Sequence, residues 1–257
     1  RKCECCGSGN LERIWEYGHT ARTINNSWDF HLTNVICKTC GFVFVSPAPT
    51  PESLNGYYSD NYTAYDKQVP DYEIDNRIEF IKHHLKGASV FVDVGSNKKT
   101  LFHKFAENIF DKVLTVEPNT GVESDMSSIE TLPKDSVDML AHYFVLEHIP
   151  SVKGFLTECR KALKPGGIMI IEVPDIRIYP DDIRALIAHE HVNHFSQNIL
   201  DRIAAGAGFT RISGPSSVCS RPYGFAAAFM NERPGTRASC DTANEYYENK
   251  YSFMDTY

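Results

Sequence analysis

The sequence lacks the features that mark membrane, secreted and nucleic-acid-binding proteins. It contains no apolar stretch approaching the roughly 20 residues that a membrane-spanning helix needs. It carries no dense run of lysine and arginine, and its formal net charge of −7 disfavours an anionic polymer as a partner. No secretion signal is evident, so a disulfide framework is not expected. We therefore expect a cytoplasmic globular protein that binds neither membranes nor nucleic acid.

A further absence concerns glycine in the loop that follows the apolar run "VFVDV" at residues 90–94. Gly95 is followed by Ser96 and Asn97, and then by Lys98 and Lys99. A dinucleotide-binding loop carries a third glycine, which opens the helix N-terminus to a pyrophosphate. The missing glycine therefore disfavours NAD as the cofactor. We assign the two lysines to solvent, with contact to an anionic ligand as the alternative.

Cysteine content and hydrophobic periodicity divide the chain into four parts. Residues 1–50 hold five of the eight cysteines and short β-type runs, and they end at the proline-rich "SPAPTP". Residues 51–71 form an aromatic linker. From 72 to 235, amphipathic helices alternate with apolar strands, which indicates an α/β domain whose parallel sheet is covered on both faces. Residues 236–257 are expected to be helical, and both chain ends are consistent with further domains in a longer parent protein.

Two Cys-x-x-Cys pairs in the first part match a four-thiolate zinc site in a small ribbon-like domain. The predicted ligands are Cys3, Cys6, Cys37 and Cys40. A glycine follows the second cysteine of each pair, where the turn favours a positive φ. Cys5 could replace Cys3 or Cys6, and a redox dithiol or unrelated cysteines are the alternatives. Because protein fills all four positions, we interpret the zinc as structural.

Polar residues follow three expected strands at the edge where parallel sheets bind ligands. The first group contains Asp93, Gly95, Ser96 and Asn97, where small residues let a ligand approach the backbone. Glu117 and Pro118 end the next strand, and a carboxylate about twenty residues after the glycine turn can accept hydrogen bonds from ribose hydroxyls. Tyr143 lies at the end of the third strand. These residues are the predicted cofactor site.

The order of these segments resembles the class I S-adenosylmethionine-dependent methyltransferases over about residues 75–230. The segments are "VDVGSN", "VEP", "LPKDSVDML", "VLEHIP" and "LKPGGIMIIEVP". The resemblance implies a Rossmann-like seven-stranded sheet and bound S-adenosylmethionine. It places Asp93, Gly95 and Asn97 at the methionine end of the cofactor and Glu117 at the ribose. Ser128 and Ile129 fall at the adenine, where Ser128 replaces the aspartate that is usual in the family.

The segment at 175–196 is long and rich in histidine, as substrate-binding lids are. Its "HEHVNHFS", together with the N-terminal cysteines, resembles the zinc-ribbon-bearing methyltransferases of sugar and polysaccharide pathways. That resemblance implies that His191 is the general base, with Glu190 beside it and His148 as a further catalytic residue. Ala188 stands where the sugar C-methyltransferases carry a tyrosine, so O-methylation is favoured over C-methylation.

Elementary chemistry supports the assignment of His191. A histidine with a near-neutral pKa suits removal of a proton from a hydroxyl, and Glu190 could orient the ring. The alternative is that these histidines are surface or capping residues. They lack the spacing and the third ligand of a familiar zinc motif, so a second metal site is not expected. The predicted acceptor contacts are His189, His194, Tyr58 and Tyr62, although the tyrosines could instead join two domains.

The sequence therefore predicts a methyltransferase with a structural zinc module, acting on a small hydroxylated molecule such as a sugar or nucleotide sugar. A role in carbohydrate biosynthesis follows from that acceptor. Two alternatives stay open at this point. One is a non-catalytic binding module, in which the zinc domain and a degenerate cofactor domain recruit a partner. The other is an NAD-dependent nucleotide-sugar enzyme.

Overall fold

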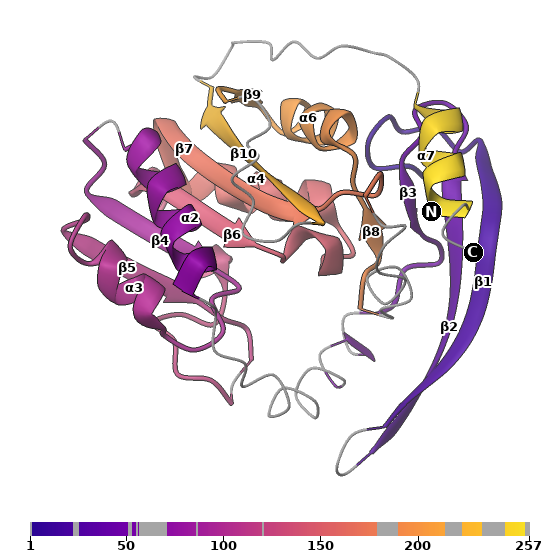
Figure 1. Cartoon of the computed structure of the whole chain (residues 1–257), viewed down its shortest axis with the longest axis horizontal. Coiled ribbons are helices and arrows are strands. Elements are labelled where there is room, and N and C mark those ends of the chain that lie inside the picture. The colour runs from indigo at the N-terminus through magenta and orange to yellow at the C-terminus, as the bar shows by residue number, and fades with distance from the viewer. Residues whose placement is uncertain are drawn as a thin grey trace.

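The computed structural model consists of a six-stranded and a four-stranded β-sheet packed side by side (Figure 1). No helix in the described part of the chain is long and apolar enough to cross a membrane. The structure describes residues 2–22, 26–50, 53–54, 56, 71–85, 87–119, 121–178, 190–213, 223–232 and 245–254.

The larger sheet has the strand order β5-β4-β6-β7-β10-β9. Its strands are β4 (Val90–Val94), β5 (Lys112–Val116), β6 (Val137–Tyr143), β7 (Leu163–Pro174), β9 (Phe209–Arg211) and β10 (Gly224–Asn231). The first four run parallel, and β10 is antiparallel to both of its neighbours. Outside β5, a single parallel bridge joins Val116 to Met126 at the place of a seventh strand. The predicted α/β fold is confirmed.

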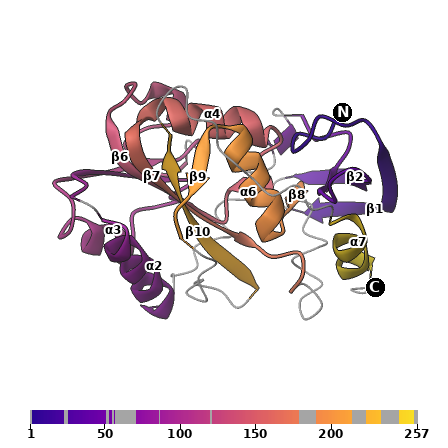
Figure 2. The same cartoon turned by 90° about the horizontal axis from the view of Figure 1, so that it is seen from above.

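Helices cover both faces of this sheet (Figure 2). The helices α2 (Asp71–His83) and α3 (Leu101–Ala106) lie on one face, and α4 (Val152–Ala162) and α6 (Gln197–Gly206) lie on the other. Successive strand residues point to opposite faces. Phe91 accordingly packs with α2 and α3, whereas Val92 packs with α4 and α6. Burial on both faces explains why these strands are continuous apolar runs.

Local sequence signals set the ends of these elements. Ser196 is the N-cap of α6, and its hydroxyl accepts a hydrogen bond from the Ile199 backbone N–H at 3.3 Å. The segment "KPGG" has the proline and glycines of a turn, but it lies within the bounds of β7. Residues 164–167 bulge outward opposite Asp138, because Gly166 has a φ of +82° and lets the strand re-pair at Ile168.

The smaller sheet has the order β1-β2-β3-β8, with all pairs antiparallel. Its strands are β1 (Leu11–Arg22), β2 (Ser27–Cys37), β3 (Val43–Val45) and β8 (Asn193–His194). The first three come from the cysteine-rich part of the sequence. The fourth comes from "HVNHFS", so the histidine-rich segment completes the N-terminal sheet. Phe42 and Phe195 stack at 5.7 Å between ring centroids and join the two cores.

The C-terminal helix α7 (Tyr246–Met254) packs against the smaller sheet (Figure 1). Asn249 donates a hydrogen bond from Nδ2 to the Gly41 carbonyl at 3.0 Å. A Cβ at Gly41 would lie 2.5 Å from the carbonyl carbon of Glu245, so only glycine admits this approach. Lys250 pairs with Glu12 of β1. The helix predicted for the C-terminal part is present, and it closes over the cysteine-bearing turn.

Candidate active site and cysteine cluster

Two residues of the loop after β4 have backbone φ angles in the left-handed region. Gly95 has a φ of +71° and Asn97 a φ of +53°. A Cβ at Gly95 would lie 2.4 Å from Cγ2 of Val145, which precedes the short 3₁₀ helix η3 (Leu146–His148). The Gly95 backbone N–H donates to the Val116 carbonyl at 2.8 Å. The loop is therefore fixed between the carboxyl ends of β5 and β6, with its backbone close to both.

Glu117 follows β5 and lies beneath this loop. Its side chain is 4% exposed. Oε2 accepts a hydrogen bond from the Asn97 backbone N–H at 2.9 Å, and Oε1 accepts one from Asn119 at 3.1 Å. Burial raises the pKa of Glu117, and the nearby Asp93 carboxylate raises it further. Each carboxylate oxygen keeps a second lone pair with which it can accept a ligand hydroxyl.

Asp93 lies in β4 and is held by a histidine that the sequence analysis did not select. His103 Nε2 is 3.0 Å from Asp93 Oδ2, and both side chains are buried. The Thr100 backbone N–H donates to His103 Nδ1 at 2.9 Å, so Nδ1 carries no proton. The proton of a neutral ring therefore lies on Nε2, and His103 donates it to the carboxylate. This bond fixes one oxygen of Asp93.

Tyr143 ends β6 on the same edge of the sheet. Its hydroxyl is buried and has no hydrogen-bond partner within the described part of the chain. The Arg77 guanidinium of α2 lies 4.2 Å from the ring centroid and also pairs with the buried Glu172 of β7 at 3.2 Å. Burial raises the pKa of Tyr143 well above its usual value. The buried Tyr143 hydroxyl lies near the Asp93 carboxylate and the Arg77 guanidinium. Together these groups can bind a ligand that carries both a positive and a negative charge.

The predicted adenine contacts lie on the short 3₁₀ helix η2 (Ile129–Thr131). Ile129 is buried, whereas Ser128 caps the helix by accepting a hydrogen bond from the Glu130 N–H at 3.2 Å. Pro118 is exposed next to Glu117, and Ser96 is buried in the loop after β4. All four residues follow β4 or β5 in the chain, and their contact with a cofactor stays a prediction.

The two lysines at the start of α3 are both exposed. Lys99 forms an ion pair with Asp125 at 3.3 Å. Asp125 also accepts hydrogen bonds from the backbone N–H and the hydroxyl of Thr115. Burial opposes the effect, but these bonds and Lys99 lower the pKa of Asp125. Lys99 therefore has a structural partner that composition and spacing did not indicate.

Beyond the end of β6, the structure brings together His148, Glu190 and His191. His148 Nδ1 donates to the Glu190 carbonyl at 3.0 Å, since a carbonyl oxygen only accepts. The rings of His148 and His191 meet edge to face at 4.8 Å between centroids. Glu147 is buried, and its Oε1 lies 3.7 Å from His148 Nε2. The catalytic role of these residues stays a prediction, but their proximity agrees with it.

Of the four predicted acceptor contacts, the structure describes His194 alone. Tyr58, Tyr62 and His189 lie outside the described residues. His194 lies in β8 and is 1% exposed, and its Nε2 is 3.2 Å from Oδ1 of the buried Asn34. Burial lowers the pKa of His194 to about 3, so the ring is neutral at ordinary pH. His194 is therefore bonded to β2 within the smaller sheet, and it has little exposed surface that an acceptor could contact.

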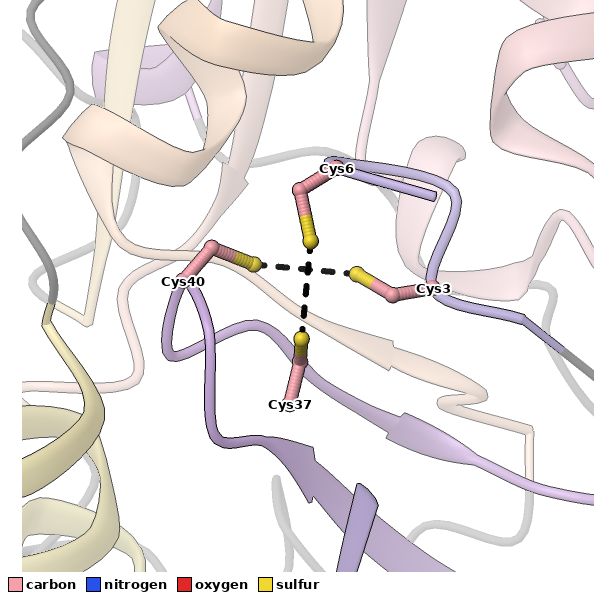
Figure 3. A group of neighbouring side chains, drawn as sticks. All are labelled: Cys3, Cys6, Cys37 and Cys40. Atoms are coloured by element: carbon pink, nitrogen blue, oxygen red, sulfur yellow. Dashed lines mark hydrogen bonds between the residues drawn. The ribbon is translucent and has the colours of Figure 1, made fainter. Parts of the chain in front are cut away.

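The cysteine cluster lies where β2 turns into β3 (Figure 3). Its members are Cys3, Cys6, Cys37 and Cys40, and all four sulfurs lie within 4.8 Å of one another. Two of the Sγ–Sγ distances, Cys3 to Cys40 and Cys6 to Cys37, are 3.6 Å. Tetrahedral zinc with Zn–S bonds of about 2.3 Å requires sulfurs about 3.8 Å apart. Cys5 is outside the group, which resolves the ambiguity in the first pair.

The two cysteine turns have the same backbone geometry. Gly7 donates to the Cys3 carbonyl and Gly41 to the Cys37 carbonyl, each at 2.8 Å. The glycines have φ values of +77° and +85°, as the sequence predicted. In each turn the chain reverses after the second cysteine, so both sulfurs point inward (Figure 3). The arrangement fits one tetrahedral ion held by four thiolates.

Comparison with known families decides the class of the larger domain. A family model described as a methyltransferase domain matches residues 65–213, which is more than half of the chain. The chain belongs to the methyltransferase domain family. A curated relative from Mycolicibacterium smegmatis, named a probable S-adenosylmethionine-dependent methyltransferase, is 36% identical over 44 residues. That match spans only 17% of this chain and 17% of the relative.

Solved methyltransferase structures share the fold. One is Burkholderia thailandensis 1,6-didemethyltoxoflavin-N1-methyltransferase, solved with 1,6-didemethyltoxoflavin and S-adenosylhomocysteine. It has a TM-score of 0.57 and 13% identity, over 75% of this chain and 96% of that one. A Thermotoga maritima S-adenosylmethionine-dependent methyltransferase has a TM-score of 0.51 and 15% identity, over 70% and 100% of the two chains. At these identities the likeness shows the fold alone.

Three residues of the candidate site were not selected from the sequence. His103 follows Asp93 by ten positions and is the third residue of α3, the helix that follows the loop after β4, and that position was the one usable signal. Arg77 lies on the amphipathic helix α2, where a charge normally indicates a solvated face. Glu172 sits in an apolar strand, and a buried carboxylate there predicts a partner without naming it.

Proposed function

We propose that the chain transfers a methyl group from S-adenosylmethionine to a small hydroxylated acceptor. The observation that carries the proposal is the pair of buried carboxylates, Asp93 and Glu117, on either side of the left-handed loop. S-adenosylmethionine carries an ammonium and a ribose diol, and it has no phosphate. Two acceptor groups at adjacent strand ends suit it better than a dinucleotide, and the family match agrees.

Within this proposal, each carboxylate has its own part of the cofactor. Asp93 accepts hydrogen bonds from the ammonium, and His103 acts as a positioning residue by holding the other carboxylate oxygen. Glu117 accepts both ribose hydroxyls through its remaining lone pairs. Gly95, Ser96, Asn97 and Tyr143 surround the methionine end, and Pro118, Ser128 and Ile129 surround the adenosine end.

The proposed chemistry is an in-line displacement. The acceptor oxygen attacks the methyl carbon, the carbon–sulfur bond breaks, and S-adenosylhomocysteine leaves as a neutral thioether. The acceptor proton passes to His191, whose ring lies beside His148 beyond β6. The resemblance of "HEHVNHFS" to the sugar methyltransferases supports a sugar-like acceptor and O-methylation.

We also propose that the four cysteines hold a structural zinc ion. Three of the four ligands are fully buried, with Cys6 exposed. Burial makes a redox dithiol a poor alternative, because thiol exchange needs access to the sulfurs. Four protein thiolates leave no open coordination position, so the ion would stabilise the fold and take no part in methyl transfer.

Calorimetry with S-adenosylmethionine and S-adenosylhomocysteine tests the cofactor assignment. Both should bind in the micromolar range, and Asp93→Ala should weaken both at least tenfold because an ammonium partner is lost. Lys104→Ala changes an exposed residue of α3 and serves as the matched control. If neither ligand binds below millimolar concentration, the proposal of an enzyme fails. That result would favour the alternative of a non-catalytic binding module.

A second experiment tests the acceptor side. A panel of nucleotide sugars and free sugars, assayed with labelled S-adenosylmethionine, should reveal a methylated product. His191→Ala should abolish turnover while S-adenosylhomocysteine affinity stays within twofold of wild type. Loss of cofactor affinity in that variant would instead assign His191 a structural role.

A further inference from the structure

We propose that Glu147, His148 and His191 form a second metal site, which takes a divalent cation with a preference for nitrogen and oxygen ligands. One ligand atom from each residue lies within 4.8 Å of the other two. Two imidazoles and one carboxylate suit zinc, iron, cobalt or manganese. The site differs in donor set from the cysteine cluster, and the spacing of the histidines in the sequence did not predict it.

The orientation of His148 supports metal binding. Its Nδ1 donates to the Glu190 backbone carbonyl at 3.0 Å. Its Nε2 consequently faces Oε1 of Glu147, 3.7 Å away. A histidine that binds a metal commonly donates its other ring N–H to a backbone carbonyl or carboxylate, which fixes the tautomer. His148 already has that arrangement.

The burial of the cluster suits an enclosed ion. Glu147 is 1% exposed, and the two imidazoles are partly buried next to it. Together the three side chains offer a divalent ion one carboxylate oxygen and two ring nitrogens as ligands.

The backbones that carry the three ligands are tied together. The Val192 N–H donates to the Glu147 carbonyl at 2.8 Å. The buried Asn193 donates from Nδ2 to the carbonyls of Leu146 and Ile149, at 3.3 and 2.8 Å. Asn193 also belongs to β8, which pairs with β3. The ligands from η3 and from the segment before β8 therefore hold a fixed separation.

The position of the site, together with the proposed function on which this step rests, indicates what the bound ion would contact. Three protein ligands leave at least one open coordination position, as in catalytic metal sites. Val145, two residues before Glu147 in the chain, contacts the position that a Gly95 side chain would take, so the site borders the loop after β4. An ion here would hold an acceptor with adjacent oxygens, such as a vicinal diol. In the loaded form His191 would be a ligand, and its role as base in the proposed methyl transfer applies to the form without the ion.

Cobalt binding tests this site without any assay of activity. Full-length protein with its zinc content measured is dialysed against Co²⁺, and bound cobalt and zinc are counted by mass spectrometry. We expect one Co²⁺ per chain with zinc retained, and visible absorption without intense thiolate charge-transfer bands. Binding of no cobalt below millimolar concentration, or cobalt bound only in exchange for zinc, would overturn the proposal.

Variants locate the cobalt. Glu147→Gln keeps the side-chain shape, and His191→Ala removes one ring; each should weaken cobalt binding at least tenfold. His83→Ala, which removes an exposed histidine of α2, is the matched control and should bind as wild type does. Full affinity in His191→Ala would place the cobalt elsewhere and refute the site. S-adenosylhomocysteine affinity, measured on the same samples, tests the cofactor proposal separately, since cobalt binding does not require it.

Discussion

At the residue scale, the proposed cofactor site at the carboxyl ends of β4 and β5 contains ionisable side chains that are buried away from water. Glu117 is the clearest case, because burial raises the pKa of its carboxyl above the ordinary value of 4.5. Two backbone N–H groups oppose the shift without reversing it. The ionised carboxylate is the form that accepts hydrogen bonds from a ribose diol. Ligand binding and proton binding therefore compete at Glu117.

We predict that S-adenosylhomocysteine affinity falls as pH is lowered through the raised pKa of Glu117, because protonation of Glu117 removes an acceptor. The free energy of unfolding should move the opposite way across this carboxyl's titration. The folded chain binds the proton more tightly than the unfolded chain, so stability falls as pH rises from 4.5 to the raised pKa. Calorimetry across pH measures the first effect. Glu117→Gln should weaken binding roughly tenfold and flatten its pH profile, and an unchanged profile would assign the effect to another group.

Gly95 gives a second prediction at this scale, with a control in the same chain. Gly95→Ala combines a strained φ with a contact to Val145 at 2.4 Å. Gly87→Ala carries the same strain at a φ of +73°, but nothing lies within 4 Å. Strain of this kind costs about 1–3 kcal/mol. Thermal denaturation should show the larger loss for Gly95→Ala, and only that variant should lose cofactor affinity. Equal losses would show that the loop moves away from Val145 at no cost.

At the element scale, β8 contains only two residues, yet it connects three parts of the molecule. It pairs with β3, its Asn193 binds the ends of η3, and two residues separate it from α6. The sequence predicted a functional role for the histidine segment. It did not predict a strand there. A strand this short carries no periodicity, and its partner lies about 150 residues away in the sequence.

We predict that Asn193→Ala impairs the histidine cluster as well as stability. Asn231→Ala is the matched control, because the buried Asn231 also donates from Nδ2 to backbone carbonyls, those of Arg160, Leu163 and Lys164. In each variant these carbonyls lose the amide that donates to them, at a cost of about 1–3 kcal/mol. Chemical denaturation should show similar losses, and only Asn193→Ala should reduce turnover and cobalt binding. Equal effects on turnover would remove the positioning role of Asn193.

At the scale of the whole molecule, the cysteine cluster belongs to the same core as the larger sheet. Cys3, Cys37 and Cys40 pack with Phe42 and, through it, with Phe195. Glu4, between the first two ligands, accepts a hydrogen bond from the backbone N–H of Lys153 in α4 at 3.0 Å. On the other side, Asn249 of α7 binds the glycine of the second turn. The cysteine cluster is thus attached to two helices from different parts of the fold, α4 and α7.

We predict that loss of the metal lowers the stability of the entire fold in one transition. Native mass spectrometry should show one zinc ion in wild type and in Cys5→Ser, and none in Cys37→Ser. Structural zinc contributes on the order of 10 kcal/mol to folding, so Cys37→Ser should melt well below wild type by both circular dichroism and S-adenosylhomocysteine binding. Two separate transitions, with the cofactor domain unchanged, would contradict this coupling.

The sequence predicted more of the candidate site than of the contacts that hold it together. The alternation of strands and helices, the loop of small residues after β4, Glu117 and the four cysteines were predicted from short-range patterns. The partners of those residues come from distant segments, as with Arg77 and Glu172 or Asn34 and His194. Local spacing contains no information about such pairs. Lys99 is a further example. Its partner, Asp125, is brought close by the bridge between Val116 and Met126 beside β5.

The pairing of β3 with β8 also constrains the order in which the chain can fold during synthesis. The first three strands of the smaller sheet leave the ribosome before the larger sheet, but the fourth strand emerges about 150 residues after β3, and α7 later still. At typical rates of about 5–20 residues per second, β3 waits several seconds or longer with an open edge. Early metal capture by the two cysteine turns would protect that edge. Of the two sheets, the one whose synthesis starts earlier is therefore the one that depends on the later segments of the chain.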